Sequence, residues 1–191
     1  MKNHQRKSFF FKAAFTLLEL LVVIAIIAIL ASMLMPALQD AKARTSKIAC
    51  LGNLRQFGYA FNCYLNDYEN TFPRSIWPDA WYSPGVIPPY IDEKYGSVWK
   101  CPADNDSTIT LISYSYNEAL MYTKMNEKKT PAQTFLLGEG EIVCFNPLVT
   151  PDVFARFRHS SGMNLLYIDG HVEWKKFFIF PTIYKDPFWG K

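Results

Sequence analysis

Glu19 lies inside a long apolar segment, and a charge at that position needs a physical explanation. It is the only charged residue among residues 15–38. A helix over this segment would be about 36 Å long, at about 1.5 Å per residue, which is enough to cross the hydrocarbon core of a membrane. A carboxylate there is costly unless a cation lies beside it. Cleavage before Phe15 would supply that cation, because the new amino group and the positive end of the helix dipole would both lie near Glu19.

The segment around Glu19 also carries a motif. It begins with Lys12-Ala13-Ala14-Phe15-Thr16-Leu17-Leu18-Glu19 and continues without charge to Leu30. This motif resembles the class III signal of type IV pilins and type II secretion pseudopilins. The resemblance implies that a prepilin peptidase removes the basic leader, residues 1–14, by cutting between Ala14 and Phe15, and then methylates the new amine. Residues 15–38 would remain as transmembrane and assembly helix, with Glu19 as the assembly residue. Ala14 departs from the Gly that is usual before the cut, so slower cleavage is expected.

The same resemblance implies a location and partners. The chain would cross the inner membrane once, with its N-terminus in the cytoplasm and its head in the periplasm. Its partners would be the prepilin peptidase, other pilin or pseudopilin subunits in a homo- or hetero-filament, and the inner-membrane assembly platform. A cleaved secretory signal is disfavoured because the apolar segment is longer than a signal core. An uncleaved anchor, the other alternative, would leave Glu19 without a cation.

The charge distribution excludes a further class of protein. The formal net charge is +3, but Lys2, Arg6, Lys7 and Lys12 all precede residue 15, so the remaining residues carry a formal charge of −1. A nucleic-acid-binding protein needs Lys and Arg clustered on its folded body. We therefore predict no nucleic-acid partner.

His159, Asp169 and His171 are the residues of the C-terminal part whose types could do chemistry. His159 precedes Asp169-Gly170 by nine residues, and this spacing resembles the His-x9-Asp-Gly signature of a subset of pilin-like proteins. Two other segments fit the same group, Cys101-Pro102-Ala103-Asp104 and Ser113-Tyr114-Ser115-Tyr116-Asn117. The family assigns the signature no catalytic role, so we predict no enzyme and no catalytic residue, and we expect His159 to fix the hairpin by a hydrogen bond. A zinc or hydrolytic site from the two histidines and Asp169 is the weaker alternative, since zinc needs three or four converging ligands.

Cation and thiol chemistry have weaker candidates. Related pseudopilins bind calcium through a loop of the head, which makes Asp104, Asn105 and Asp106 a weak calcium site; no other metal or cofactor is predicted. Cys50, Cys63, Cys101 and Cys144 lie beyond the apolar segment, where the resemblance implies an oxidising compartment. Cys50 and Cys63 on one helix would lie about 20 Å apart, too far for a disulfide. We favour a disulfide between Cys50 and Cys101, with four free thiols as the alternative.

Residues 39–68 predict an amphipathic continuation of the apolar helix, which Pro36 should kink or locally melt. Apolar residues recur there at intervals of three, four or seven, the period of one helix face. They are Leu38, Ala41, Ile48, Leu51, Leu54, Gly58, Phe61, Leu65 and Tyr68. This stripe needs a partner, which the head, residues 69–191, would supply. Aromatic residues of the head, such as Trp81 and Trp99, are expected in its core rather than on a ligand-binding surface.

Two hairpins are predicted in the head. One joins residues 134–137 to residues 141–145. The other joins residues 163–168 to residues 171–174 through a two-residue type I′ turn at Asp169-Gly170. That turn would place one apolar face against the long helix, formed by Leu165, Tyr167, Val172 and Trp174. The predicted fold class is α+β, a long N-terminal helix packed on a small antiparallel β-sheet head, as in pilins.

Three functions follow from these features. The first is a structural pilin or pseudopilin subunit that assembles into a type IV pilus-like or type II secretion pseudopilus filament. The second is a membrane-anchored module that binds a polysaccharide or an exported protein without polymerising. The third is an anchored enzyme. Glu19 favours the first, because an anchor alone has no use for the carboxylate.

Overall fold

The computed structural model describes residues 16–75, 80–91, 96–104, 112–140, 144–145, 156–176 and 187–189. Ala14, Phe15, Asn105 and Asp106 lie outside these residues. The chain divides into two compact units, residues 1–41 and residues 42–191. The second unit contains the last part of the long helix and the sheet. From here on the head means this whole unit, which adds residues 42–68 to the head predicted from the sequence.

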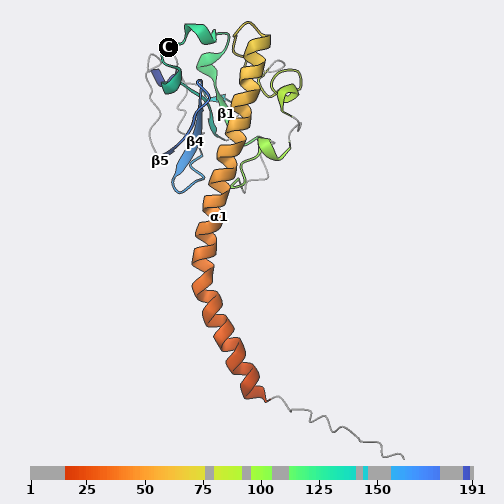
Figure 1. Ribbon diagram of the computed structural model, residues 1–191, viewed down its shortest axis with the longest axis vertical. Coiled ribbons are helices and arrows are strands. Elements are labelled where there is room, and N and C mark those ends of the chain that lie inside the picture. Colours follow the sequence, from red (N-terminus) through yellow and green to blue (C-terminus); the bar gives the residue numbers. More distant parts are fainter. Residues whose placement is uncertain are drawn as a thin grey trace, which may run out of the picture. The chain divides into compact units, whose positions relative to one another are not determined.

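One α-helix, α1 (Leu17–Asp67), runs through both units (Figure 1). It passes Pro36 without a break, so the melted turn predicted there is not present. The helix ends where Glu69 and Asn70 adopt positive φ angles of 52° and 58°. The Asn70 N–H then donates to the carbonyl of Leu65 at 2.7 Å, a bond that closes a helix end of the Schellman kind.

The head contains a five-stranded sheet with the order β3-β1-β2-β4-β5. The strands are β1 (Tyr114–Asn117), β2 (Phe135–Glu139), β3 (Cys144–Phe145), β4 (Gly162–Tyr167) and β5 (Val172–Lys176). Neighbours among β1, β2, β4 and β5 are antiparallel, and β3 runs parallel to β1. Short 3-10 helices cover Pro88–Tyr90, Ser97–Trp99, Glu118–Leu120, Met125–Glu127, Pro131–Gln133 and Pro187–Trp189. The predicted α+β class, a long helix on a small antiparallel sheet, is confirmed.

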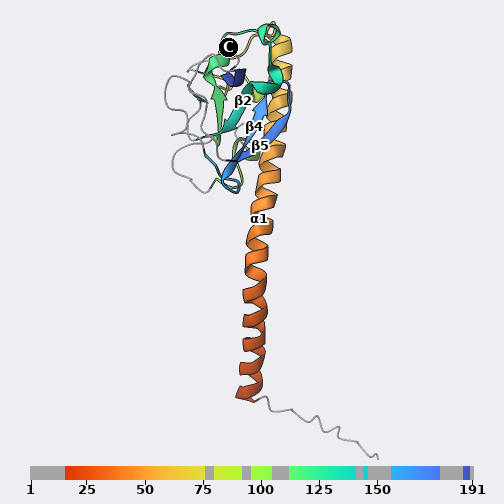
Figure 2. The same cartoon turned by 90° about the vertical axis from the view of Figure 1, so that its left-hand side faces the viewer.

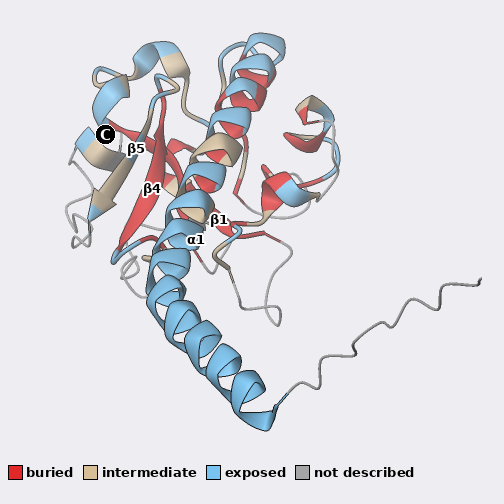
Figure 3. Cartoon of the chain, turned by 60° about the horizontal axis from the view of Figure 1, so that its bottom comes forward, coloured by how far each residue is buried: buried red, intermediate tan, exposed pale blue. Residues whose placement is uncertain are grey.

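The C-terminal half of α1 packs along one face of this sheet, as the two views in Figures 1 and 2 show. Its buried residues are Cys50, Leu54, Phe57, Gly58, Ala60, Phe61, Tyr64 and Leu65. The predicted stripe is therefore correct from Leu54 to Leu65. It is wrong at its two ends: Tyr68 is 48% exposed, and Ile48 is 67% exposed while Cys50 takes the buried position there. Figure 3 shows the same change along the helix, from exposed in its first half to a buried stripe in the head.

Aromatic rings fill the space between the helix and the sheet. Phe57 meets the rings of Trp99 and Tyr114 edge-on, at centroid distances of 4.9 and 5.4 Å. Phe61 stacks on Tyr116 at 5.8 Å. Trp81 and Trp99 are fully buried, which confirms that these aromatic residues form core rather than a stacking surface.

The hairpin of β4 and β5 differs from the prediction by one residue. Leu166 pairs with Val172 and Asn164 with Trp174. Gly170 has a φ of 90°, its N–H donates to the Tyr167 carbonyl at 3.0 Å, and Asp169 is not among the residues with positive φ. These features match a three-residue loop, in which a type I turn precedes a left-handed glycine, rather than a type I′ turn.

The shift of register reverses the faces of β4, because side chains alternate along a strand. Leu166 and Ile168 join the core beneath α1. Leu165 and Tyr167, predicted to cover the helix, lie instead in a second apolar cluster with Phe135 and Met163. The sheet therefore buries both faces, which explains why every residue of β4 is buried.

The other predicted hairpin is also wrong in its pairing. β2 pairs with β1 and β4, and Cys144–Phe145 pairs with β1 instead of turning back on β2. Residues 141–143, which precede β3, lie outside the described residues. The motif Ser113–Asn117 supplies β1, an interior strand of the sheet that was not predicted from the sequence.

Candidate functional site

The N-terminus of α1 holds Glu19 in a capping box, a reciprocal pair of side-chain bonds at a helix start. The Glu19 Oε2 atom accepts from the Thr16 backbone N–H at 2.9 Å and from the Thr16 hydroxyl at 3.0 Å. In return the Glu19 N–H donates to Thr16 Oγ1 at 3.2 Å. Both partners are neutral, so they satisfy hydrogen bonds of the carboxylate without neutralising its charge.

The apolar residues that follow Glu19 make up the surface of the first half of α1. Side chains from Leu17 to Leu38 are exposed, including Leu21 at 63%, Ile27 at 58% and Leu34 at 67%. The helix is long and apolar enough to cross a membrane, and none of its apolar window is buried in the chain. A surface of this kind is stable only in lipid or against other apolar surfaces.

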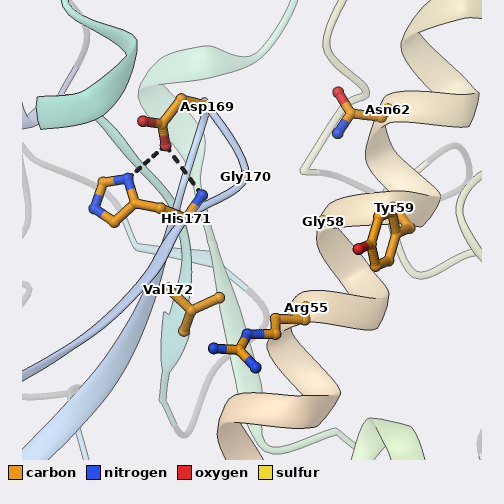
Figure 4. A pocket seen from close by; sticks show the side chains of 8 residues that line it. All are labelled: Arg55, Gly58, Tyr59, Asn62, Asp169, Gly170, His171 and Val172. Atoms are coloured by element: carbon orange, nitrogen blue, oxygen red, sulfur yellow. Dashed lines mark hydrogen bonds and ion pairs between the residues drawn. The ribbon is translucent and has the colours of Figure 1, made fainter.

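In the head, Asp169, Gly170 and His171 form the exposed loop between β4 and β5. The Asp169 carboxylate accepts from the His171 N–H at 3.1 Å and also contacts the His171 ring. Figure 4 shows this loop across a hollow of about 390 Å³ from Arg55, Tyr59 and Asn62 of α1. The His171 ring stacks on Tyr167, so its orientation is set by the hairpin itself.

His159 does not join that loop. Its Nε2 atom lies 3.2 Å from Cys101 Sγ and 3.0 Å from Glu139 Oε1, in the interior of the head. The expectation that His159 fixes the hairpin holds only for its backbone, whose carbonyl accepts from Trp174 Nε1 at 2.9 Å. The structure therefore does not bring His159, Asp169 and His171 together as a zinc or hydrolytic site.

A tight turn places the His159 ring. The N–H of His159 donates to the Gly162 carbonyl, and the N–H of Gly162 donates to the His159 carbonyl, each at 3.0 Å. Ser160 and Ser161, at the tip, have positive φ angles of 53° and 59°. Two successive left-handed residues that are not glycine are costly, and such conformations cluster at functional sites.

Four buried side chains meet at this point: Cys50, Cys101, Glu139 and His159. Their ligand-type atoms all lie within 4.8 Å of one another. We call this group the thiol–carboxylate cluster. Cys50 Sγ donates to Glu139 Oε1 at 2.7 Å and lies 3.3 Å from the Tyr114 hydroxyl. The amide of Asn164 donates to the same Glu139 oxygen at 3.0 Å.

The contacts within the cluster change how its groups hold protons. A hydrogen bond with Cys50 lowers the pKa of Cys101 to about 6. Burial, together with the neighbouring Cys101 and Glu139, raises the pKa of Cys50 far above its usual value. Burial lowers the pKa of His159, but its hydrogen bonds to Cys101 and Glu139 outweigh this and raise it to about 9. The cluster therefore favours a Cys101 thiolate beside a protonated His159.

The favoured disulfide between Cys50 and Cys101 is not present. Both residues lie in the cluster, as the prediction of their proximity requires, but both are free thiols, and the exposed Cys63 is free as well. The side chain of Cys144 lies outside the part of the chain that the structure describes.

The weak calcium candidate is described only at Asp104. Its carboxylate lies 2.9 Å from Arg158 Nη2 and accepts from the Ser113 hydroxyl at 2.6 Å. Arg158 therefore already neutralises this carboxylate. The ion pair links the loop that carries Cys101 to the turn that carries His159, which makes Asp104 a support of the cluster.

Residues 11–35 match a family described as the prokaryotic N-terminal methylation motif. No curated protein and no solved structure matches the chain. The matched residues include the end of the leader with Lys12, the predicted cleavage site at Ala14 and Phe15, and Glu19. They also include most of the exposed apolar part of α1. The chain thus carries a type IV pilin-like prepilin signal on a membrane-anchoring helix, and a prepilin peptidase is the partner that such a signal implies.

Proposed function

We propose that this chain is a structural pilin or pseudopilin subunit, cut between Ala14 and Phe15, that assembles through α1 into a pilus-like or pseudopilus filament. The observation that carries the proposal is the coincidence of the methylation motif with the start of an exposed apolar helix. A helix that served only as an anchor would not need Glu19 at its first turn. No catalytic role is proposed for the head.

The proposal places the subunit in the inner membrane before assembly, with the N-terminus in the cytoplasm and the head in the periplasm. During assembly, the helices of neighbouring subunits would replace lipid around the exposed side chains of α1. Other subunits and an inner-membrane assembly platform are therefore the proposed partners.

Photo-cross-linking tests this function directly. A photoreactive amino acid at Ile27, whose side chain is 58% exposed, should link the helix to neighbouring subunits in cells with prepilin peptidase and an assembly platform. The products should be ladders of cross-linked subunits that appear in the sheared filament fraction. A peptidase-deficient strain is the matched control and should give none.

If the chain is instead a membrane-anchored binding module, the photo-cross-linking experiment should give another result. The mature chain would be processed and would stay in the membrane fraction, and Ile27 would give no subunit ladder. That outcome, in cells that assemble their own filaments normally, would contradict the filament proposal.

A further inference from the structure

The thiol–carboxylate cluster brings four potential metal ligands together inside the head, and it has no role in the proposed processing and assembly of the chain. We propose that this cluster is a zinc site, in which Cys50 Sγ, Cys101 Sγ, His159 Nε2 and a Glu139 carboxylate oxygen bind one Zn²⁺ ion. The inference stands on the head alone and does not depend on filament assembly.

The ligand types and spacing fit zinc. Thiolate, imidazole and carboxylate are the protein ligands of Zn²⁺, with bonds of about 2.0–2.3 Å and tetrahedral geometry. Such bond lengths place neighbouring ligand atoms about 3.3–3.8 Å apart. The contacts of His159 Nε2 with Cys101 Sγ, 3.2 Å, and with Glu139 Oε1, 3.0 Å, lie just below this range, and no pair in the cluster exceeds 4.8 Å. The distance from Cys50 Sγ to Glu139 Oε1, 2.7 Å, is shorter, so these two side chains would move apart to admit the ion.

Glu139 gives a second, independent indication of a ligand. Its side chain is fully buried, and its Oε1 atom takes the contacts from Cys50, His159 and Asn164. Its Oε2 atom is buried without a hydrogen-bond partner in the described structure. A buried carboxylate oxygen without a partner is costly, and a bound cation would remove that cost.

The surroundings resemble the supporting shell of a metal site. The Asn164 amide donates to Glu139, and the Tyr114 hydroxyl contacts the Cys50 sulfur, so each contact could orient a ligand. The ion pair of Asp104, 7% exposed, with Arg158, 11% exposed, joins the two segments that carry Cys101 and His159. These contacts hold the ligand-bearing segments together from outside the cluster.

The binding step balances in charge and atoms. Zn²⁺ displaces two protons, one from the Cys50 thiol and one from the protonated His159, which leave to water, and it binds two thiolates, one carboxylate and one neutral imidazole. The site then carries a formal charge of −1, which the Asn164 amide and the Tyr114 hydroxyl partly offset by hydrogen bonds. All four ligands come from the protein and are at most 3% exposed, so the site is closed and structural rather than catalytic.

A disulfide is the main competing state of the two thiols. It would use only Cys50 and Cys101, and it would leave the buried Glu139 Oε2 as it stands. Zinc uses all four groups and ties together α1, the Cys101 loop, the end of β2 and the turn before β4. The site would thus fasten the helix to the sheet.

The test uses the full chain, purified in detergent from membranes, with free thiols blocked during extraction. Elemental analysis of this protein should find one zinc per chain. Exchange for Co²⁺ should give thiolate-to-metal charge-transfer bands and the visible bands of tetrahedral cobalt. Cys50→Ser, Cys101→Ser, His159→Gln and Glu139→Gln should each lose stoichiometric metal. Cys63→Ser, which alters an exposed thiol on the same helix, is the matched control and should keep it.

If a variant fails to fold, its loss of metal is uninformative, and the zinc content of the wild-type chain decides the question. Removal of the metal by a chelator should lower the unfolding temperature of the wild-type chain, and Zn²⁺ should restore it whereas Ca²⁺ should not. Wild-type protein without bound metal and without a cobalt spectrum overturns the proposal. A mass two hydrogens lower, localised to a peptide joining Cys50 to Cys101, would overturn it in favour of the disulfide.

Discussion

Glu19 has two separable properties, its charge and its hydrogen bonds to Thr16. Gln is also accepted at the third position of a capping box, so Glu19→Gln keeps the box and removes only the charge. Thr16→Ala does the reverse and should cost the helix start about 1 kcal/mol. We expect Glu19→Gln to lower incorporation into filaments, and Thr16→Ala to leave it near the wild-type level. Sheared fractions compared by immunoblot measure this.

The reason for that contrast is the low dielectric of a filament core, where a carboxylate needs a cation rather than neutral donors. The amine of a mature Phe15, in the same or a neighbouring subunit, is the proposed cation. Leader removal, followed by mass spectrometry, should be unchanged in both variants. Equal incorporation of Glu19→Gln and wild type would refute a role of the charge in assembly.

Gly162 lies against β5 with no room for a side chain. A Cβ atom there would lie 2.4 Å from the Lys175 carbonyl oxygen and 2.5 Å from the Trp174 ring. Gly162→Ala should therefore destabilise the head by about 1–3 kcal/mol, the usual cost of overpacking. The midpoint of urea unfolding, followed by the fluorescence of the buried tryptophans, measures the loss.

Gly52→Ala is the matched control for that change. Gly52 lies in α1, and in the described part of the chain no atom apart from the neighbouring helix backbone lies within 4 Å of its Cβ position. Ala should stabilise this helix by about 1 kcal/mol. The two substitutions thus have opposite predicted signs, and a Gly162→Ala chain as stable as wild type would contradict the geometry of this hairpin.

At the scale of elements, the contact between α1 and the sheet depends on aromatic packing. Phe57 is fully buried against Trp99, Tyr114 and Trp81. Phe57→Ala should cost about 3–5 kcal/mol, because it removes a large buried ring and leaves a cavity. Tyr59→Ala, two residues along the helix, removes a ring that is 74% exposed and should change stability by less than about 0.5 kcal/mol.

Unfolding of the full chain in detergent distinguishes the two variants. If both cost the same, the head half of α1 does not pack on the sheet with the face that the structure shows. The exposed half of the helix is unaffected by either substitution and serves as an internal reference for helix content by circular dichroism.

The helix was predictable from the sequence because both of its signals are local. The apolar run and the period of Leu54, Gly58, Phe61 and Leu65 follow from the repeat of one helix.

The hairpin of β4 and β5 was predicted in place but not in register. Asp-Gly fits a type I′ turn and also a type I turn followed by a left-handed Gly170, and only packing decides between them. That one-residue difference moved Leu165 and Tyr167 to the opposite face.

At the scale of the whole molecule, the thiol–carboxylate cluster could not be found from spacing. Its four residues come from segments far apart in the sequence, and the fold alone brings them together. The sequence did mark Cys101, Asp104 and His159 as parts of motifs. The structure gives these motifs a shared position: Cys101 and His159 lie in the cluster, and Asp104 supports it through Arg158. Glu139, a charged residue between two glycines at the end of the apolar strand β2, is the local signal from which this site could have been predicted.

In the proposed function, removal of the leader converts this chain from a membrane precursor into an assembly subunit. We expect the mature protein to begin at a methylated Phe15, because only that cut creates an amine beside Glu19. Ala14→Leu should block removal of the leader, since a bulky residue replaces the small one before the cut. Ala14→Gly, the residue usual in the resembling family, should speed it. Pulse-chase labelling with intact-mass measurement of membrane-extracted protein follows both changes. An intact leader on wild-type protein from peptidase-competent cells would show that α1 is a permanent anchor, and among the described residues the carboxylate of Glu19 would then bond to Thr16 without a cation beside it.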